Sequence, residues 1–285
     1  MKTRSTASTL LLLANLATVS LNSHAAEAFK VCADPINPPY STKEQTGYEN
    51  KIAALLAEQL GQELQYTWLP DRIGFIRNTL KAENDNGQGF KCDVVMGVPA
   101  GFELTDTTKA YFRSSYVLLI AKGRGWDDIK DAAQLSNLEP ARQEKLKIAM
   151  FDRGPGTEWL QKNGLLEQGV PYQSMTGDSE HNTAMQIEQD LSHGKIDMVI
   201  LWGPMAGYVQ SQPSKTHYTA IAMQSSAGIK FDYAIAMGIR QGDGKRKQQL
   251  NESIDKNLPK IQQIIGSYHI PTLPIGDTGK PKDDD

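Results

Sequence analysis

The chain has 285 residues, of which 39% are hydrophobic and 22% are charged. This composition excludes a disordered or collagen-like chain, and the length suits two α/β domains or one large α/β unit. The formal net charge of −3 argues against a nucleic-acid-binding protein, which normally carries a large basic excess.

The N-terminal segment, residues 1–25, has the pattern of a secretory signal peptide. Lys2 and Arg4 precede an uncharged run over residues 10–21, and small residues follow at Ser23 and at the end of the segment. This run is short for a membrane span. Removing the segment takes away two basic residues and no acidic one, so the net charge falls from −3 to −5. We therefore expect an exported protein without a membrane span in its mature form, and an N-terminal anchor is the alternative.

Two cysteines remain after that cleavage, Cys32 and Cys92. Export leads to an oxidising compartment, where a disulfide is chemically allowed. The bond would close a loop of about 60 residues and stabilise the fold by roughly 4 kcal/mol in the chain-entropy description. A pair of buried thiols is the alternative, and two cysteines alone cannot build a zinc site.

The first half of the chain alternates strand patterns with helix patterns. Three short apolar runs are typical of strands, at residues 29–33, 64–68 and 94–98. Between the first two, apolar residues recur at helical spacing over residues 48–60, and Gly61 ends that helix. Residues 75–80 are predicted to be part of a second helix. This β-α-β-α-β order implies a parallel sheet with helices on its faces.

The second half repeats the pattern. Strands are predicted at residues 146–151, 196–202 and 233–239. A helix is expected from Thr157, after the Gly-Pro-Gly turn at residues 154–156, and a second one ends at Gly194, which suits a left-handed position. Pro204 fits the first turn of a third helix. The sequence therefore predicts a second α/β unit.

The C-terminal region has apolar residues at helical spacing from Leu250 to Ile265. Pro259 interrupts this pattern and predicts a division into two helices, because proline removes a backbone donor and clashes with the preceding turn. The chain is expected to return to the first unit at its end.

This order of elements resembles the type II periplasmic binding proteins, specifically the family 3 solute receptors. The segments that carry the resemblance are residues 31–35, 39–41, 47–61, 92–97, 112–116, 154–157 and 194–197. The resemblance implies an α/β fold of two lobes joined by two crossover strands. Lobe 1 would comprise residues 27–118 and 236–285, and lobe 2 residues 119–235. Because the first and third strands are neighbours in that family's sheet, the resemblance also predicts a Cys32–Cys92 disulfide.

A narrower resemblance is to the MxaJ (MoxJ) family, encoded with the quinoprotein methanol dehydrogenase of methylotrophic bacteria. It is carried by residues 31–35, 47–53, 75–80, 92–101, 111–116 and 201–204. It implies a non-catalytic periplasmic accessory protein that binds methanol dehydrogenase subunits or assists their assembly. The pyrroloquinoline quinone (PQQ) cofactor would then belong to the partner enzyme, and the chain itself would need no cofactor.

The wider resemblance to the family 3 receptors bears on the ligand. Family 3 amino-acid receptors hold the α-carboxylate with an arginine that sits six residues before the phenylalanine matching Phe112, and this position is Asp106. They hold the α-ammonium with an aspartate at the position of Trp202. Both charged anchors are thus replaced, which predicts no tight binding of free polar amino acids. Arg113 lies nearby and is the alternative clamp.

Open α/β sheets place their ligands at strand ends, and these ends supply the candidates for the cleft. The candidate residues are Asp34, Tyr40, Gly97, Asp106, Arg113, Gly156, Thr157 and Trp202. The turn before Thr157 could present backbone N–H groups to an anion, or be an ordinary strand–helix turn. We interpret Trp159 and Trp202 as core or cleft-wall packing rather than a cofactor site. The lobes are expected to move little, or to hold an unusual ligand.

Three function classes stay open. The first is the accessory protein of methanol oxidation. The second is the receptor of an ABC importer for a small polar solute, which the fold alone favours. The third is an enzyme on this fold, such as a cyclohexadienyl dehydratase-like lyase, although no acid and base are marked in the sequence. Outside the signal segment the histidines show no ligand spacing, so no metal site is expected.

Overall fold

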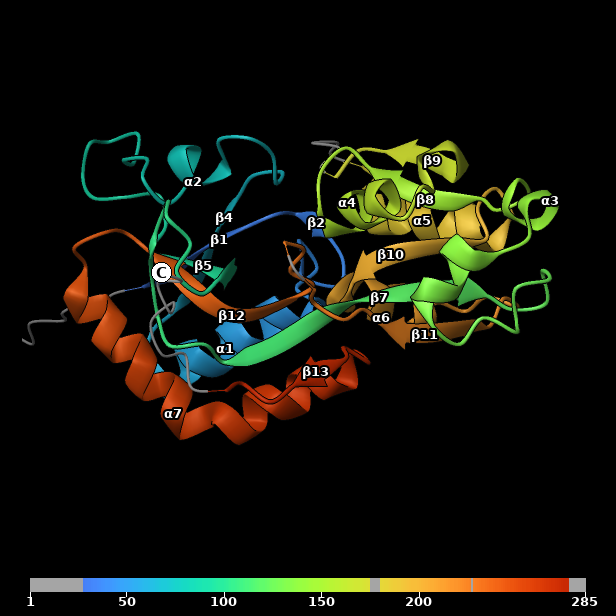
Figure 1. Cartoon of the computed structure of the whole chain (residues 1–285). Coiled ribbons are helices and arrows are strands. Elements are labelled where there is room, and N and C mark those ends of the chain that lie inside the picture. Colours follow the sequence, from blue (N-terminus) through green and yellow to red (C-terminus); the bar gives the residue numbers. More distant parts are fainter. Residues whose placement is uncertain (1–27, 175–179, 227, 277–285) are drawn as a thin grey trace, which may run out of the picture.

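The computed structural model describes residues 28–174, 180–226 and 228–276, so the predicted signal peptide lies outside the described residues. Two α/β units lie side by side, and long strands run from one to the other (Figure 1). In the described ranges no helix combines the length and the apolar character that a membrane span needs.

Three parallel strands form the centre of the first unit: β1 (Phe29–Ala33), β4 (Leu64–Trp68) and β5 (Val94–Pro99). β1 lies between the other two, with Val31 opposite Tyr66 on one side and Val94 on the other. Helix α1 (Tyr48–Leu60) connects β1 to β4, and Gly61, at φ 63°, ends it as the sequence predicts. The parallel sheet expected for this half is confirmed.

The second predicted helix is shorter than expected. Helix α2 covers Phe75–Asn78 and does not continue to Leu80. The Thr79 hydroxyl donates to the Phe75 carbonyl oxygen (2.7 Å), and the backbone of Thr79 has left the helical conformation. Leu80 is buried all the same. The apolar residues at 75–80 therefore indicate burial correctly, and the helix ends early because the Thr79 hydroxyl bonds to the backbone.

The second unit has its own parallel strands, in the order β10, β8 and β9. Its elements are β8 (Ile148–Phe151), α4 (Pro155–Lys162), β9 (Gly169–Tyr172), α5 (Thr183–Ser192), β10 (Met198–Trp202), α6 (Gly203–Ser211) and β11 (Tyr218–Ala222). α4 begins at Pro155, two residues before the predicted start at Thr157, because proline is pre-set for the first helical position. Pro204 in the first turn of α6 and the left-handed Gly194 confirm the other two expectations.

The strands β7 (Phe112–Ala121) and β12 (Asp232–Ile239) join the two units. The first residues of β7 pair with β12, and its later residues pair with β10 and β11. β12 continues alongside β5, which gives the sheet order β4-β1-β5-β12-β7-β10-β8-β9. This is the predicted type II periplasmic-binding-protein-like fold. The lobe limits after residues 118 and 235 fall inside β7 and β12, and they stay a prediction.

Helix α7 (Gly244–Ser267) is one element, so the predicted division at Pro259 is wrong. Ile254, Ile261 and Ile265 are buried in the core of the first unit, on both sides of the proline. This burial holds the two parts of the helix against the same surface although one backbone hydrogen bond is lost. The helix changes direction along its length (Figure 1), as a proline kink does.

The remaining short elements are β2 (Ile36–Asn37), β3 (Ser41–Thr42), β6 (Asp106–Thr107), β13 (Thr272–Leu273), α3 (Pro140–Gln143), and the 3₁₀ helices η1 (Ala132–Asn137) and η2 (Leu166–Gln168). Buried side chains form one core between the first unit's sheet and helices α1 and α7. In the second unit, alternate residues of β7 and β10 enter clusters on opposite faces of the sheet.

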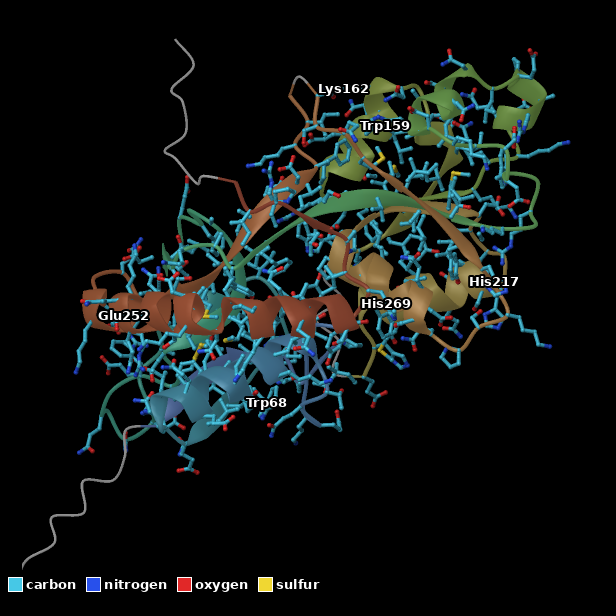
Figure 2. All side chains as sticks on the ribbon, turned by 90° about the horizontal axis from the view of Figure 1, so that it is seen from below. Trp68, Trp159, Lys162, His217, Glu252 and His269 are labelled. Atoms are coloured by element: carbon cyan, nitrogen blue, oxygen red, sulfur yellow. A yellow bond between two sulfur atoms is a disulfide. The ribbon has the colours of Figure 1, made fainter. Side chains whose placement is uncertain are left out.

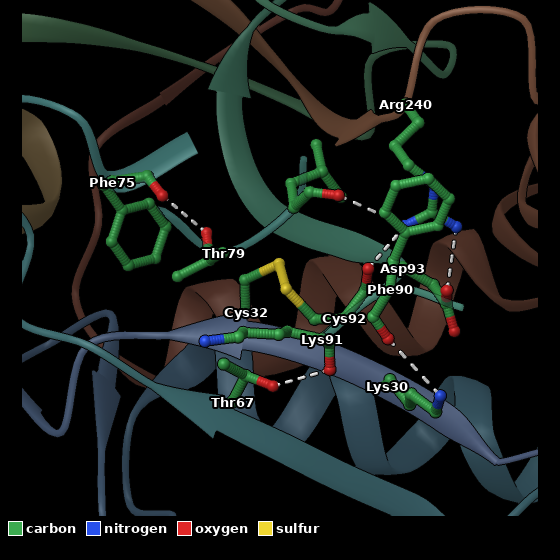
Figure 3. The surroundings of a disulfide bond; sticks show 11 residues. Lys30, Cys32, Thr67, Phe75, Thr79, Phe90, Lys91, Cys92, Asp93 and Arg240 are labelled. Atoms are coloured by element: carbon green, nitrogen blue, oxygen red, sulfur yellow. Dashed lines mark hydrogen bonds and ion pairs between the residues drawn. A yellow bond between two sulfur atoms is a disulfide. The ribbon is translucent and has the colours of Figure 1, made fainter. Parts of the chain in front are cut away.

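Cys32 and Cys92 form the predicted disulfide, with Cα atoms 5.4 Å apart (Figure 3). The bond links β1 to the segment that leads into β5. Next to it, Asp93 forms an ion pair with Arg240 (2.9 Å), and the guanidinium lies 4.2 Å from the ring centroid of Phe90. The first unit is therefore tied together covalently at Cys32 and by charge at the amino end of β5.

Candidate functional site

Two adjoining cavities lie between the units. The first, which we name the acidic cavity, has a volume of about 270 Å³. Its walls come from the ends of β1 and β5, the start of α1 and the start of α5. Its charged and polar lining residues are Asp34, Asn37, Tyr40, Ser41, Glu49, Asp71, Ser174, Asn182 and Thr183. Both units therefore contribute to one space, as expected at the carboxyl ends of α/β sheets.

Asp34 and Asp71 form one edge of the acidic cavity. Asp34 directly follows β1, and its carboxylate accepts from the backbone N–H of Ile36 (2.8 Å) and of Asp71 (2.6 Å). Asp71 follows β4. Burial and the neighbouring Asp34 charge raise the pKa of Asp71 to about 6. Asp71 thus retains its proton into a weakly acidic range where an exposed aspartate is ionised.

Glu49 stands where the two cavities meet. It lies in the first turn of α1, its backbone N–H donates to the Tyr40 carbonyl oxygen (3.0 Å), and the Tyr48 hydroxyl donates to Glu49 Oε1 (3.4 Å). Burial, with a smaller contribution from the Asp71 charge, raises the pKa of Glu49 to about 8, although the Tyr48 bond lowers it. A Cβ atom on Gly97 would overlap Glu49 Oε1. Glycine at position 97 is therefore what leaves room for this carboxyl group.

The second space, which we name the aromatic cavity, has a volume of about 360 Å³ and also borders Glu49 and Gly97. Its aromatic lining residues are Tyr40, Tyr48, Tyr116, Trp202 and Tyr233. Trp202 ends β10, and its ring centroid lies 5.3 Å from that of Tyr116 on β7 and 5.9 Å from that of Tyr233 on β12. Burial raises the pKa of Tyr116 to about 12, so this ring keeps its hydroxyl proton at neutral pH.

In the described ranges, the side chains that the second unit contributes to the two cavities are uncharged. Asn182 caps α5 by accepting from the backbone N–H of Met185 (2.9 Å). Its side-chain amide also donates across the cavity to Asn37 Oδ1 (3.1 Å) and to the Pro38 carbonyl oxygen (3.2 Å). Among the lining residues that the structure describes, none in either cavity is lysine, arginine or histidine.

Comparisons with known proteins agree with this architecture. No protein-family model matches the chain. The MoxJ protein of Methylorubrum extorquens is 29% identical over 263 residues, which cover 88% of this chain and 83% of that protein. MoxJ of Paracoccus denitrificans is 26% identical over 259 residues, covering 86% and 89% of the two chains.

A solved relative extends the agreement to three dimensions. The crystal structure of the periplasmic binding protein XoxJ from Methylobacterium extorquens AM1 superposes with a TM-score of 0.68 at 28% identity, over 87% of this chain and 100% of that one. The chain is therefore similar to MoxJ proteins and to the periplasmic binding protein XoxJ over most of its length. The resemblance and the fold class inferred from the sequence are both confirmed, and the similarity spans both units and the cleft between them.

Four of the predicted site residues line the two cavities. Asp34 lines the acidic cavity and Trp202 the aromatic one, while Tyr40 and Gly97 border both. The structure thus brings together predicted residues from the ends of β1, β5 and β10, with Tyr40 from the turn between β2 and β3.

Asp106 and Arg113 line neither cavity. Asp106 lies on β6 and forms an ion pair with Lys247 of α7 (2.6 Å). Arg113 lies on β7, and its Nε donates to the carboxylate of Asp232 on β12 (2.9 Å). Its guanidinium is therefore engaged with a neighbouring strand instead of facing a ligand.

Gly156 and Thr157 also line neither cavity. The Thr157 hydroxyl donates to the carbonyl oxygen of Phe151 (2.6 Å), which holds the start of α4 to the end of β8. A Cβ atom on Gly156 would lie 3.1 Å from the Cβ of Ile200, so glycine allows α4 to pack closely on β10. This turn has the geometry of a strand–helix connection.

Glu49, Asp71 and Asn182 also line the acidic cavity and were not predicted from the sequence. Asp71 follows a parallel strand, as Asp34 does, so the strand-end rule could have included it. Glu49 has the pattern of an ordinary acidic residue in a first helical turn. Asn182 has the pattern of a helix cap, and its second role depends on the approach of the other unit. In the described ranges, no group of three or more His, Cys, Asp or Glu side chains is placed to hold a metal ion.

Proposed function

We propose that the chain is a non-catalytic periplasmic accessory protein of methanol oxidation, which binds methanol dehydrogenase subunits or assists their assembly. The observation that carries the proposal is the similarity to MoxJ proteins over both units. The PQQ cofactor belongs to the partner enzyme in this proposal. The signal-like N-terminal segment supports a periplasmic location.

The geometry of the cleft favours this proposal over an amino-acid receptor. A free amino acid presents an α-carboxylate that needs a cationic partner. The described lining residues supply Asp34, Glu49 and Asp71 and no basic side chain. Arg113, the alternative clamp, is paired with Asp232. An α-carboxylate would therefore meet like charge in the cavity, which costs affinity instead of adding it.

Deletion of the gene in a methanol-grown host tests the proposal. We expect loss of methanol dehydrogenase activity in periplasmic extract, incomplete association of the dehydrogenase subunits, and restoration of both by the wild-type gene. A tagged copy is expected to co-purify with a dehydrogenase subunit, in a manner that weakens with salt because the mature chain is acidic. Unchanged activity and assembly, together with lost uptake of a solute, would favour the importer reading.

A receptor of an ABC importer is the second candidate, because the cleft holds a real cavity with side chains from both units. Calorimetry across the common amino acids separates the two. We expect no tight binding, since both charged anchors of the amino-acid receptors are replaced. A micromolar amino-acid ligand would restore the importer function.

A further inference from the structure

The aromatic cavity presents ring faces together with one acidic group. Trp202 and Tyr116 are partly exposed, their centroids are 5.3 Å apart, and both line the same space as Tyr40 and Glu49. Tyr233 lies on the same wall, but the Lys230 ammonium is already 5.0 Å from its ring centroid. The faces of Trp202, Tyr116 and Tyr40 are therefore the better candidates to meet a ligand.

Glu49 supplies the matching charge. Its Oε1 accepts from the Tyr48 hydroxyl, and its backbone is fixed by the hydrogen bond to Tyr40. Asp34 and Asp71 add two more carboxyl groups in the adjoining cavity, and the described lining residues include no basic side chain to balance the three. A buried carboxylate without a cation is costly, and a cationic ligand would relieve that cost.

We propose that the two adjoining cavities bind a small organic ammonium cation of the methylated-amine class. Its positive charge lies against the faces of Trp202, Tyr116 and Tyr40, and Glu49 is its counter-ion. An ammonium group is attracted to the electron-rich face of an aromatic ring, and most strongly to tryptophan. Methyl groups on the nitrogen suit the apolar surroundings of Pro99 and Ile235, which complete the cavity.

The raised pKa of Glu49 agrees with this assignment. The free carboxyl group keeps its proton up to about pH 8 because it is buried near Asp71. A bound cation would favour the ionised form, so binding should release a proton near neutral pH. This inference concerns the cleft of the chain alone, and it does not depend on the dehydrogenase being the partner.

The test is calorimetry on the mature, disulfide-bonded protein with matched ligands. Choline and tetramethylammonium are expected to bind, and 3,3-dimethyl-1-butanol, the uncharged analogue of choline, is expected to bind at least tenfold more weakly. Glycine betaine is also expected to be weaker, because its carboxylate would meet Glu49 and Asp71. Equal affinity for choline and its uncharged analogue, or no binding of either cation at millimolar concentration, would overturn the proposal.

A basic side chain of a protein partner carries the same ammonium chemistry. Nα-acetyl-lysine amide represents this source, and we expect it to bind more weakly than choline, because its single ammonium lacks the methyl groups that the cavity surrounds. Tighter binding of the lysine mimic than of choline would reject the methylated-amine class and point to a partner's side chain.

Variants locate the site. Trp202→Ala is expected to weaken choline binding at least tenfold, Trp202→Phe less, and Glu49→Gln several-fold together with loss of the proton release. Trp159→Phe is the matched control, because Trp159 lies beside Lys162 on α4, in the second unit and outside both cavities (Figure 2). Unfolding midpoints identify any variant that fails to fold. A folded Trp202→Ala protein with unchanged choline affinity would contradict the placement of the ligand.

Discussion

The two walls of the cleft differ in charge. The first unit contributes Asp34, Glu49 and Asp71, whereas the described part of the second unit's wall contributes Ser174, Asn182 and Thr183, which are neutral. In the proposal above the first wall selects the charge of a ligand, and the second contacts the first through hydrogen bonds from Asn182. Because neutral contacts are weakly affected by salt, closure of the cleft should depend less on ionic strength than binding of a charged ligand does.

The walls also differ in how they are fixed. The acidic wall adjoins the disulfide, since Cys32 also lines the acidic cavity. At the amino end of β5, the first unit is held by a partly buried cluster in which Asp93 lies 2.9 Å from Arg240 and 3.7 Å from Arg246. In the described ranges the second unit has no such cross-link, and it relies on apolar clusters on the two faces of its sheet. A wall that carries several like charges needs a rigid support, because their mutual repulsion would otherwise separate them.

The largest effect is expected from removing the cross-link. The Cys32→Ser/Cys92→Ser protein should lose about 4 kcal/mol of unfolding free energy, because the disulfide closes a loop of roughly 60 residues. Urea unfolding followed by circular dichroism measures the loss. Chemically reduced wild-type protein is the control and should show a similar loss. A change below about 1 kcal/mol would mean that the acidic wall does not depend on this bond.

A smaller effect is expected at the glycine that makes room for Glu49. Gly97→Ala should lower the unfolding free energy by about 1 to 2 kcal/mol, because its Cβ atom would overlap Glu49 Oε1 and force the carboxyl group to move. The matched control is Gly266→Ala in α7, where no heavy atom lies within 4 Å of the added Cβ atom. That change should be neutral or stabilise the protein by up to about 1 kcal/mol. Thermal unfolding of both variants distinguishes them, and equal midpoints would contradict the close approach.

The acidic wall should make stability depend on pH. Because Glu49 keeps its proton in the folded protein up to about pH 8, while the unfolded chain releases it near pH 4.5, stability should fall as pH rises between these values. Asp71 acts in the same direction up to about pH 6. The titratable groups that share an electrostatic interaction with Glu49 are Asp71, Tyr40, Tyr48, Tyr66 and Tyr111.

Glu49→Gln isolates that contribution. Between pH 5 and pH 8 the unfolding free energy of the variant should rise relative to that of wild type by about 1 to 2 kcal/mol, because glutamine does not ionise. The effect stays in this range because the wild-type carboxyl group is only partly buried. Below about pH 4 the two proteins should share the same pH dependence. Urea unfolding across this pH range provides the measurement, and parallel curves from pH 5 to pH 8 would show that Glu49 ionises normally.

The smallest effect is expected at Asp106, which lies outside both cavities. Asp106→Asn should lower the unfolding free energy by less than about 1 kcal/mol, because the ion pair of Asp106 with Lys247 is partly exposed. The variant should leave choline binding unchanged. Calorimetry beside Asp34→Asn, which alters the acidic wall itself, provides the contrast. A loss of binding on Asp106→Asn would return this residue to the ligand site.

Local pattern was sufficient to predict much of the fold. Alternation of apolar runs located β1, β4 and β5, and the glycines after α1 and α5 marked helix ends through their left-handed backbone. The pattern was wrong at Pro259, where burial of Ile254, Ile261 and Ile265 outweighs one missing hydrogen bond. Helix continuity there depends on tertiary packing, which local sequence does not report.

The site was accessible from the sequence only where its residues end strands. Asp34, Gly97 and Trp202 follow that rule. Glu49 reaches the cleft because α1 is turned so that its first turn faces β5, and this orientation is set by packing against the sheet and α7. Asp106 and Arg113 were selected by matching positions in amino-acid receptors, and here ion pairs to α7 and β12 hold them away from the cavities.

The place of β12 in the sheet has a consequence for how the chain reaches this structure. β12 lies between β5 and β7, so the sheet that begins at residue 29 is completed only by residues 232–239. The strands and helices of the second unit between residues 148 and 222 are contiguous, and they can associate as soon as they emerge. Until the final segment arrives, β5 keeps an open hydrogen-bonding edge that another chain can occupy. The edge of β5 beside the acidic wall is therefore covered only after residues 232–239 have been made, and until then it is a site at which edge-to-edge aggregation can begin.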